Sequence, residues 1–302
     1  MYNRRELVTL TLAGLAAPIF NAYVFTRGRD TAVGVQTRSF RDLHRLSGAD
    51  PIDGVIAALV SCRVHHCELF APQIEPQFVM SHGHHGMSSM ARQMMRRELR
   101  KWRLRAPESQ FRAIGQRFEM AGIAIAAFDY SPDASFSDEE IDAGFVMAKA
   151  LGAEILTASA APDIAARIAP FADRHRMVVA LRGDAAAADP NAVGSVASAL
   201  RLSKWFRLSL DIGDLTAANV DPIAFLRGQY RNVATLRLKD RRRNHGENRP
   251  WGQGDTPIRD VLRLVRDENW PIRGFVDYAY EGPAAPVDEV KKCLAYAAEA
   301  TT

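Results

Sequence analysis

Short apolar runs rich in β-branched residues alternate along the chain with segments whose apolar residues recur at helical spacing. The runs predicted as strands are 33–37, 65–70, 123–130, 154–159, 177–181, 206–211, 233–239 and 275–280. The segments predicted as helices are 52–61, 110–121, 137–150, 163–175, 191–202, 221–227, 258–269 and 287–300. This alternation favours an α/β fold, a single (β/α)8 TIM barrel, over an open doubly wound sheet. No GxGxxG or GxxxxGK[ST] motif follows a strand, so a nucleotide-binding fold lacks its best support.

Four of the predicted strands end in charged residues. They are VVALRGD at 178–184, FRLSLDIGD at 206–214, VATLRLKD at 233–240 and GFVDYAYEG at 274–282. In a parallel barrel the carboxyl ends of all strands meet at one rim, where the active sites of such barrels lie. We therefore expect the chemistry of this protein at that rim.

Composition supports a packed domain that does not bind nucleic acid. Of 302 residues, 47% are apolar and 25% are charged, and the formal net charge is +4. That surplus is too small to indicate nucleic acid as a partner. The basic runs 96–105 and 241–243 are interpreted as solvated faces. Cys62, Cys67 and Cys293 lack zinc-type spacing, and their odd number argues against a disulfide framework.

The first 22 residues have the pattern of a twin-arginine export signal. Arg4 and Arg5 precede a mildly apolar stretch at 7–20 that is too short to span a bilayer comfortably. We therefore expect a signal at 1–22, a barrel domain at 23–302, export to the periplasm, and no stable membrane span once the signal is removed. The alternative is an amphipathic N-terminal helix of a cytoplasmic protein.

Three motifs near the C-terminus carry a family resemblance. They are LDIGD at 210–214, LRLKDRRRNHGENRPWGQGDTPIRD at 236–260 and FVDYAYEG at 275–282. With them the chain resembles the xylose isomerase-like TIM barrel superfamily, and within it the sugar phosphate isomerase/epimerase relatives. The resemblance extends from VGVQTRSF at 33–40 to the last helix, and its LKDR and WGxGDTPI elements are the most specific.

The resemblance implies a metal site at the strand ends. Family members hold one divalent ion (Mn, Mg, Co or Zn) with carboxylates after strands five and eight, an Asp after strand six and a His or Gln after strand seven. Matched by position, the strand-six Asp is Asp211 and the strand-eight Glu is Asp277, while Arg182 and Arg237 occupy the other two positions. Asp211 and Asp277 are then the retained candidate metal ligands and the candidate catalytic carboxylates.

Arg182 and Arg237 argue against that metal, because a guanidinium has no lone pair and repels a cation. We expect no cofactor, with a divalent metal as the disfavoured alternative. Three uses of the arginines stay open. With Lys239 they bind an anionic sugar such as a uronate or phosphate, or one of them replaces the metal and stabilises an enediolate while Asp277 or Asp211 moves the proton. In the third, they pair with the two aspartates in an inert salt-bridge cluster.

Other candidate residues carry weaker signals. Glu68, at the end of the second strand, is a candidate sugar ligand, with an ion-paired rim residue as the alternative. Trp251 is predicted to pack over the substrate rim, on a loop that Gly252 and Gly254 allow to turn sharply. The SHGHHGM segment at 81–87 suggests a copper or zinc site, but its histidines lack helical spacing, so a mobile loop over the barrel mouth is favoured.

Two functions remain open. The first is a carbohydrate isomerase/epimerase-like protein that acts on a sugar or sugar acid by proton transfer next to a carbonyl, without the usual metal tetrad. The second is a catalytically inactive, metal-free relative that binds a carbohydrate or a partner protein. The expected partner is a small-molecule carbohydrate, and the oligomeric state is left open.

Overall fold

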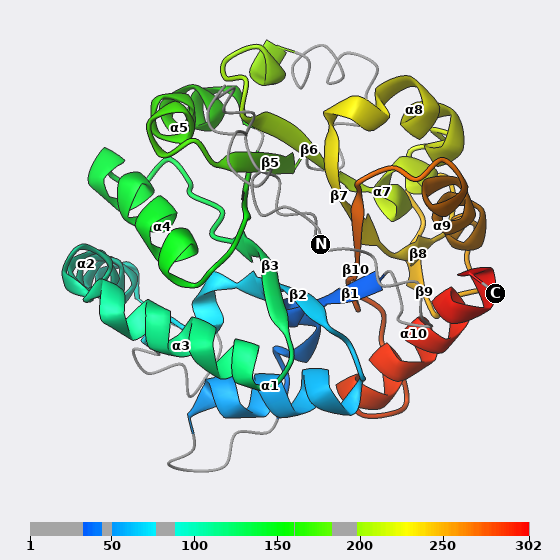
Figure 1. Ribbon diagram of the computed structural model, residues 1–302, viewed down its shortest axis with the longest axis horizontal. Helices are drawn as coiled ribbons and strands as arrows, with labels where there is room; N and C mark the ends of the chain where they lie inside the picture. The colour runs from blue at the N-terminus through cyan, green and yellow to red at the C-terminus, as the bar shows by residue number, and fades with distance from the viewer. Residues whose placement is uncertain (1–32, 44–49, 77–87, 160, 183–197, 302) are drawn as a thin grey trace, which may run out of the picture. The chain divides into compact units, whose positions relative to one another are not determined.

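Eight parallel strands close into a barrel. The computed structural model describes residues 33–43, 50–76, 88–159, 161–182 and 198–301. The signal at 1–22, the 81–87 segment and most of the predicted helix at 191–202 lie outside these residues. The barrel strands are β1 (Val33–Gln36), β2 (His66–Phe70), β3 (Ala124–Asp129), β4 (Ile155–Ser159), β5 (Val178–Arg182), β6 (Phe206–Asp211), β7 (Val233–Leu238) and β10 (Arg273–Val276). β10 pairs with both β7 and β1, which closes the ring and confirms the predicted (β/α)8 barrel (Figure 1).

Helices follow the strands and surround them (Figure 1). They are α1 (Pro51–Ser61), α2 (Ser89–Arg105), α3 (Glu108–Met120), α4 (Asp138–Ala150), α5 (Pro162–His175), α7 (Ile212–Ala217), α8 (Pro222–Gln229), α9 (Ile258–Asp267) and α10 (Pro286–Thr301). The predicted capping box of α4 is present, with Ser137 and Glu140 bonding to each other's backbone. In the described part of the chain, no helix is both long enough and apolar enough to cross a membrane.

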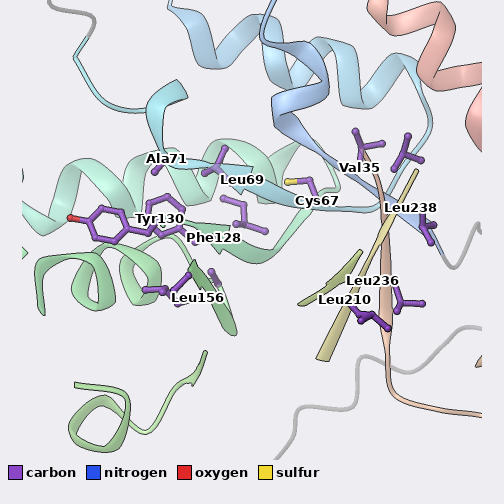
Figure 2. Close-up of a cluster of buried hydrophobic side chains, with 14 of the residues drawn as sticks. Val35, Cys67, Leu69, Ala71, Phe128, Tyr130, Leu156, Leu210, Leu236 and Leu238 are labelled. Atoms are coloured by element: carbon purple, nitrogen blue, oxygen red, sulfur yellow. The ribbon is translucent and has the colours of Figure 1, made fainter. Parts of the chain in front are cut away.

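Alternation along the strands separates an outer core from the barrel interior. Figure 2 shows part of the outer core, where Leu69, Phe128 and Leu156 project from neighbouring strands. All three are almost fully buried. Burial of each such side chain is worth roughly 1.5–3 kcal/mol, so the packing of helices on strands supplies most of the stability of this framework.

A second, smaller apolar cluster is separate from the outer core and consists of Ala126, Ala127, Ile155, Ala180 and Phe275. The strand register places Phe275 beside Arg237 and Ala127 beside Glu68. Phe275 also meets His66 edge-on, with 5.7 Å between the ring centres. Burial lowers the pKa of His66 to about 4, so this histidine is neutral at physiological pH. The cluster therefore forms an uncharged floor inside the barrel.

Helix α2 corrects the interpretation of the basic run 96–105 as a solvated face. Arg103 is buried and pairs with Glu75 at 2.7 Å and with Glu140 at 3.3 Å. Its guanidinium lies 4.2 Å from the ring centre of Phe136. Arg96 adds a 2.6 Å pair to Glu140. Ion pairs and cation–π contacts therefore hold α2 in place, and hydrophobic periodicity does not reveal such contacts.

The eighth barrel strand ends earlier than the predicted segment 275–280. β10 stops at Val276, and two residues later the N–H of Tyr278 bonds to the Ser39 hydroxyl at 3.0 Å. The hydroxyl of Tyr280 donates to Glu289 of α10 at 2.8 Å. Side-chain acceptors thus take over from the strand ladder, and the segment beyond β10 is fixed to the surrounding elements.

Candidate functional site

Charged side chains from several strands gather at the carboxyl end of the barrel. Seven of them form the connected set that we call the mouth cluster: Glu68, Asp129, Arg182, Asp211, Arg237, Lys239 and Asp277. Five of them stand at or just beyond the end of a barrel strand, and Arg237 is the last residue but one of β7. Glu68, predicted at the end of its strand, lies in the middle of β2. Residues two apart on a strand share a face, so Arg237 and Lys239 project to the same side of β7. The cluster therefore has a lower layer around Arg237 and an upper layer around Lys239.

Arg237 is the centre of the lower layer. Its side chain is 4% exposed, and its Nη2 lies 2.9 Å from Asp129 and 3.4 Å from Glu68, while its Nη1 lies 3.4 Å from Asp277. Glu68 also accepts a 2.6 Å hydrogen bond from the hydroxyl of Thr157. Both terminal nitrogens of this guanidinium thus serve buried carboxylates. Asp129 and Asp277 each have a second cation, Arg182 and Lys239, so Glu68 depends most on Arg237.

Lys239 joins the two aspartates of the upper layer. Its Nζ lies 2.7 Å from Asp211 Oδ2 and 3.4 Å from Asp277 Oδ2. The other carboxylate oxygen of Asp211 accepts the N–H of Asp214 at 3.0 Å and so caps α7. The side chain of Lys239 is 17% exposed, against 4% for Arg237. The upper layer therefore reaches solvent, whereas the lower layer does not.

Arg182 closes the cluster on the side of β3 and β5. It donates to Asp129 at 3.1 Å and to the hydroxyl of Ser131 at 3.0 Å, and its side chain is 22% exposed. Ser131 has a φ of 44° and donates to Asp129 at 2.5 Å. Gln36 of β1 donates to the same carboxylate at 3.0 Å. A left-handed non-glycine residue costs roughly 1–3 kcal/mol, so these bonds hold the turn in a strained form that orients Arg182.

The two aspartates that share Lys239 have pKa values shifted in opposite directions. Burial raises the pKa of Asp211, and the nearby ammonium offsets this only in part. Burial acts in the same direction on Asp277, but Lys239 and Arg237 outweigh it and hold the pKa of Asp277 below its ordinary value. The pKa of Lys239 is raised, because its carboxylate partners outweigh burial. Paired carboxylates with pKa values pushed apart are typical of sites in which one group exchanges a proton and the other stays ionised.

The ion pairs differ from those predicted for an inert cluster. Of the predicted pairs of the arginines with Asp211 and Asp277, the structure contains Arg237 with Asp277. Arg182 pairs with Asp129 instead. Arg182 projects from β5 and Asp129 ends β3, and Ser131 in the turn after β3 bonds to both of them. The partner of Asp211 is the lysine that follows β7.

Sequence reasoning missed two polar residues of the mouth. Asp129 accepts hydrogen bonds from side chains of three different strands. It is the last residue but one of the predicted strand 123–130 and the last of β3, so the rule that drew attention to four other charged strand ends also applies to it. Gln36 gave no comparable signal, because an uncharged amide at the end of a strand is common in proteins.

Trp251 lies apart from the mouth cluster in the contacts of the described residues. It is 9% exposed and packs edge-on against Tyr296 of α10, with 6.0 Å between the ring centres. The indole therefore anchors its loop to the last helix. A contact between Trp251 and a substrate stays a prediction.

The loop that carries Trp251 is fixed by one carboxylate. Asp240 accepts the N–H groups of Gly252 at 2.8 Å, Gly254 at 2.9 Å and Thr256 at 3.1 Å. A side chain at Gly254 would collide with this carboxylate, which explains the glycine. We call residues 240–256 the Asp240 loop. It includes the small hairpin of β8 (Asp240–Arg241) and β9 (Asn248–Arg249), and it contains most of the motif that carries the family resemblance.

The mouth cluster does not fit the divalent metal that the resemblance implies. Lys239 and Arg237 already contact Asp211 and Asp277, and their positive charges oppose a metal ion at that position. Among the residues that the structure describes, no group of three or more His, Cys, Asp or Glu side chains is arranged to hold a metal.

Comparison with known proteins identifies solved structures of the same architecture. No family model and no curated protein matches the chain. A xylose isomerase domain protein from Planctomyces limnophilus is 16% identical with a TM-score of 0.56, over 81% of this chain and 89% of that one. A sugar phosphate isomerase/epimerase from Parabacteroides distasonis is 12% identical with a TM-score of 0.59, over 90% and 97%. An L-ribulose 3-epimerase is 10% identical with a TM-score of 0.58, over 89% and 93%. The chain has the fold of these barrels. At such identities the fold is what is shared, and the function has to be argued from the side chains of the mouth.

Proposed function

We propose that the chain is an isomerase- or epimerase-like enzyme that moves a proton next to the carbonyl of a sugar or sugar acid. In this proposal protein cations take the place of a divalent metal. The observation that carries it is the bridge of Lys239 between Asp211 and Asp277. The bridge puts a fixed positive charge and two carboxylates together at the solvent-facing side of the cluster. The likeness to barrels named as isomerases and epimerases supports the class of reaction.

Proton abstraction next to a carbonyl needs a base, and it needs positive charge at the carbonyl oxygen. In the proposed isomerisation Asp211 takes the proton from the carbon beside the carbonyl. The C–H electron pair forms a C=C bond, and the carbonyl π pair moves to oxygen, where Lys239 stabilises the enediolate. Asp211 then returns the proton to the former carbonyl carbon. The hydroxyl proton passes from the neighbouring hydroxyl oxygen to the enediolate oxygen, while Asp277 stays ionised and holds Lys239 in place, so that atoms and charges balance.

The test starts with ligand discovery on the mature protein. A panel of aldoses, ketoses, uronates and sugar phosphates is screened by thermal shift, and each ligand that binds is then incubated in D2O. We expect product or carbon-bound deuterium with at least one ligand, without added metal and in the presence of a chelator. Asp211→Asn should lower this rate by roughly 10²–10⁴-fold. Asp255→Asn, in the Asp240 loop, is the matched control and should leave the rate unchanged.

Two results would contradict the proposal. One is ligand binding with neither product nor deuterium incorporation in the parent protein. The other is stoichiometric Mn, Co or Zn in the purified protein together with activity that a chelator abolishes, since this would assign the positive charge to a metal.

The pairing of Arg237 with three carboxylates favours a second candidate function. In this alternative the chain is a metal-free relative that binds a carbohydrate without turnover, and the cluster serves to shape the pocket. Binding that persists in Asp277→Asn, with no product from the parent protein, would support this candidate over the enzyme.

We also propose that the barrel is exported by the twin-arginine route. The support is the pair Arg4 and Arg5 ahead of a mildly apolar stretch. Fusion of residues 1–22 to a reporter that is active only when exported folded should give periplasmic activity. Replacing both arginines with lysine should abolish that activity, and activity confined to the cytoplasm would contradict the proposal.

A further inference from the structure

Arg38 is an exposed arginine at the mouth of the barrel. It lies in the short 3-10 helix η1 (Thr37–Phe40), directly after β1. Its neighbours Thr37 and Ser39 are buried, whereas Arg38 is exposed. Its backbone N–H bonds to the side chain of Gln36, which itself donates to the mouth cluster. The turn that carries Arg38 is therefore continuous with the site.

Ser39 fixes this turn beside Asp277. The Ser39 hydroxyl donates to the carbonyl of Val276 at 3.3 Å and accepts the N–H of Tyr278 at 3.0 Å. These two backbone groups stand on either side of Asp277. The turn that carries Arg38 is thus bonded to the segment that carries an upper-layer carboxylate.

On its other side Arg38 is oriented by an aromatic ring. Its guanidinium lies 5.7 Å from the ring centre of Phe70, at the end of β2. β1 lies between β2 and β10 in the barrel, so Arg38 occupies the rim between Phe70 and Asp277. Its charge is close enough to help lower the pKa of Asp277, but within the described ranges no ion pair joins Arg38 to a carboxylate. A cation–π contact positions a guanidinium and leaves its N–H groups able to donate to another anion.

The other cations of the mouth are already engaged. Arg237 is 4% exposed and serves three carboxylates, and Lys239 is 17% exposed and serves two. Arg182 is 22% exposed and has two nitrogens committed to Asp129 and Ser131. Counted as ionised, the mouth cluster has four carboxylates against three cations, so without further positive charge it would repel an anion.

We propose that Arg38 binds the anionic group of the substrate, a carboxylate or a phosphate at one end of a sugar. From there the sugar extends over Lys239 toward Arg182, because β1 and β5 lie on opposite sides of the barrel. This inference rests on the proposed carbohydrate function, but it concerns which sugars bind and not whether they react.

The test measures binding and turnover separately. Several aldoses, each with its uronate and its terminal phosphate, are titrated calorimetrically into the mature protein. We expect at least one uronate or phosphate to bind ten-fold or more tightly than its neutral parent, and the favoured arm identifies the anion as carboxylate or phosphate. Arg38→Gln should erase this preference, and Arg38→Lys should keep part of it. Arg112→Gln, an exposed arginine on α3, is the control and should preserve it.

Three outcomes would overturn the inference. They are equal binding of acids and neutral sugars, a preference that survives Arg38→Gln, and absence of binding by every acid and phosphate of the panel. If a sugar acid binds only when Arg38 is present but incorporates no deuterium, the anion site is supported and the proposed reaction is contradicted. If a neutral sugar is turned over at a rate that Arg38→Gln does not change, the proposed reaction is supported and the anion site is contradicted.

Discussion

Lys239 and Asp240 are successive residues, yet they belong to regions that use charge in opposite ways. Asp240 bonds to three backbone N–H groups of its own loop and has a fixed structural partner for each bond. Lys239 bonds to one carboxylate at the end of β6 and another just beyond β10, and its side chain still reaches solvent. Successive side chains of an extended segment point to opposite sides, so Lys239 contacts the mouth cluster while Asp240 contacts its own loop.

The comparison shows what the family-like motif of this chain encodes. The LKD and WGQGD elements supply the carboxylate, the glycines and the N–H groups of the Asp240 loop. At Gly252, with a φ of 86°, and at Gly254, beside the Asp240 carboxylate, the geometry of that loop disfavours a side chain. Arg182 and Arg237, which stand at the positions where the resemblance implies metal ligands, lie in the mouth cluster. Resemblance therefore identifies the framework, while the chemistry depends on the residues that differ.

The largest loss of stability is expected in the lower layer of the mouth cluster. Arg237→Met leaves Glu68 and Asp129 buried without their main cation, and breaking a buried pair costs about 3–5 kcal/mol. Urea unfolding at neutral pH measures the loss. Arg182→Met, at a more exposed position, is the control and should cost much less. Equal losses for the two variants would contradict the division into layers.

A smaller loss is expected in the Asp240 loop. Asp240→Ala removes a charged acceptor from three N–H groups, and a hydrogen bond to a charged group is worth about 1.5–3 kcal/mol. Because water can replace part of the lost bonding, we expect a loss of about 2–3 kcal/mol in the free energy of unfolding. Asp255→Asn in the same loop should change stability by less than about 0.5 kcal/mol. If Asp240→Ala leaves the free energy of unfolding unchanged, the structural role assigned to the motif is contradicted.

Lys239→Met should separate function from stability. Arg237 remains as a partner for Asp277, but the buried carboxylate of Asp211 keeps only its bond to the N–H of Asp214, so the loss of stability should be about 2 kcal/mol. In the same variant the proposed proton transfer should fall by about 10²-fold or more, because the charge on the enediolate is no longer stabilised. Unfolding and deuterium incorporation measured on one preparation test both expectations. A large loss of stability with unchanged exchange would reverse the roles of the two layers.

The smallest expected effect is on the stability of the protein at acid pH. Burial alone would raise the pKa of Asp277, but Lys239 and Arg237 hold it below the ordinary value of 3.8. A carboxylate whose pKa is lowered by folding stabilises the folded state fully at pH values above its ordinary pKa. This stabilisation is lost as the pH falls through the lowered pKa of the folded state. The stability difference between the parent and Asp277→Asn should therefore shrink as pH is lowered from about 7 to 3. Asp255→Asn should show a weaker trend, because Asp255 is a surface group. Thermal unfolding across this pH range is the measurement.

The sequence predicted the barrel well because each β/α unit carries its own local signal. The runs at 206–211 and 233–239 correspond to β6 and β7 almost residue for residue. Hydrophobic periodicity did not predict helix α2, because ion pairs from its arginines to Glu140 hold it in place. Six of the seven predicted site residues meet in one cluster, since strand ends converge in a barrel. Their pairing was not predictable, because it depends on the turn at Ser131 and on distances across the barrel.

The uncharged floor has a consequence for isotopic labelling. Below Arg237 and Asp211, on the same faces of their strands, lie the buried hydroxyls of Thr235 and Ser209. Around them are apolar side chains such as Phe275, with neutral His66 beside it. These groups carry no charge, and the ion pairs of the lower layer separate them from the solvent-facing upper layer, so we expect exchange with bulk water to pass through the opening by which the substrate enters. A substrate that covers Asp211 during the proposed reaction would shield the abstracted hydrogen from washing out. The fraction of deuterium that migrates within one molecule would then report how completely the bound sugar closes the barrel.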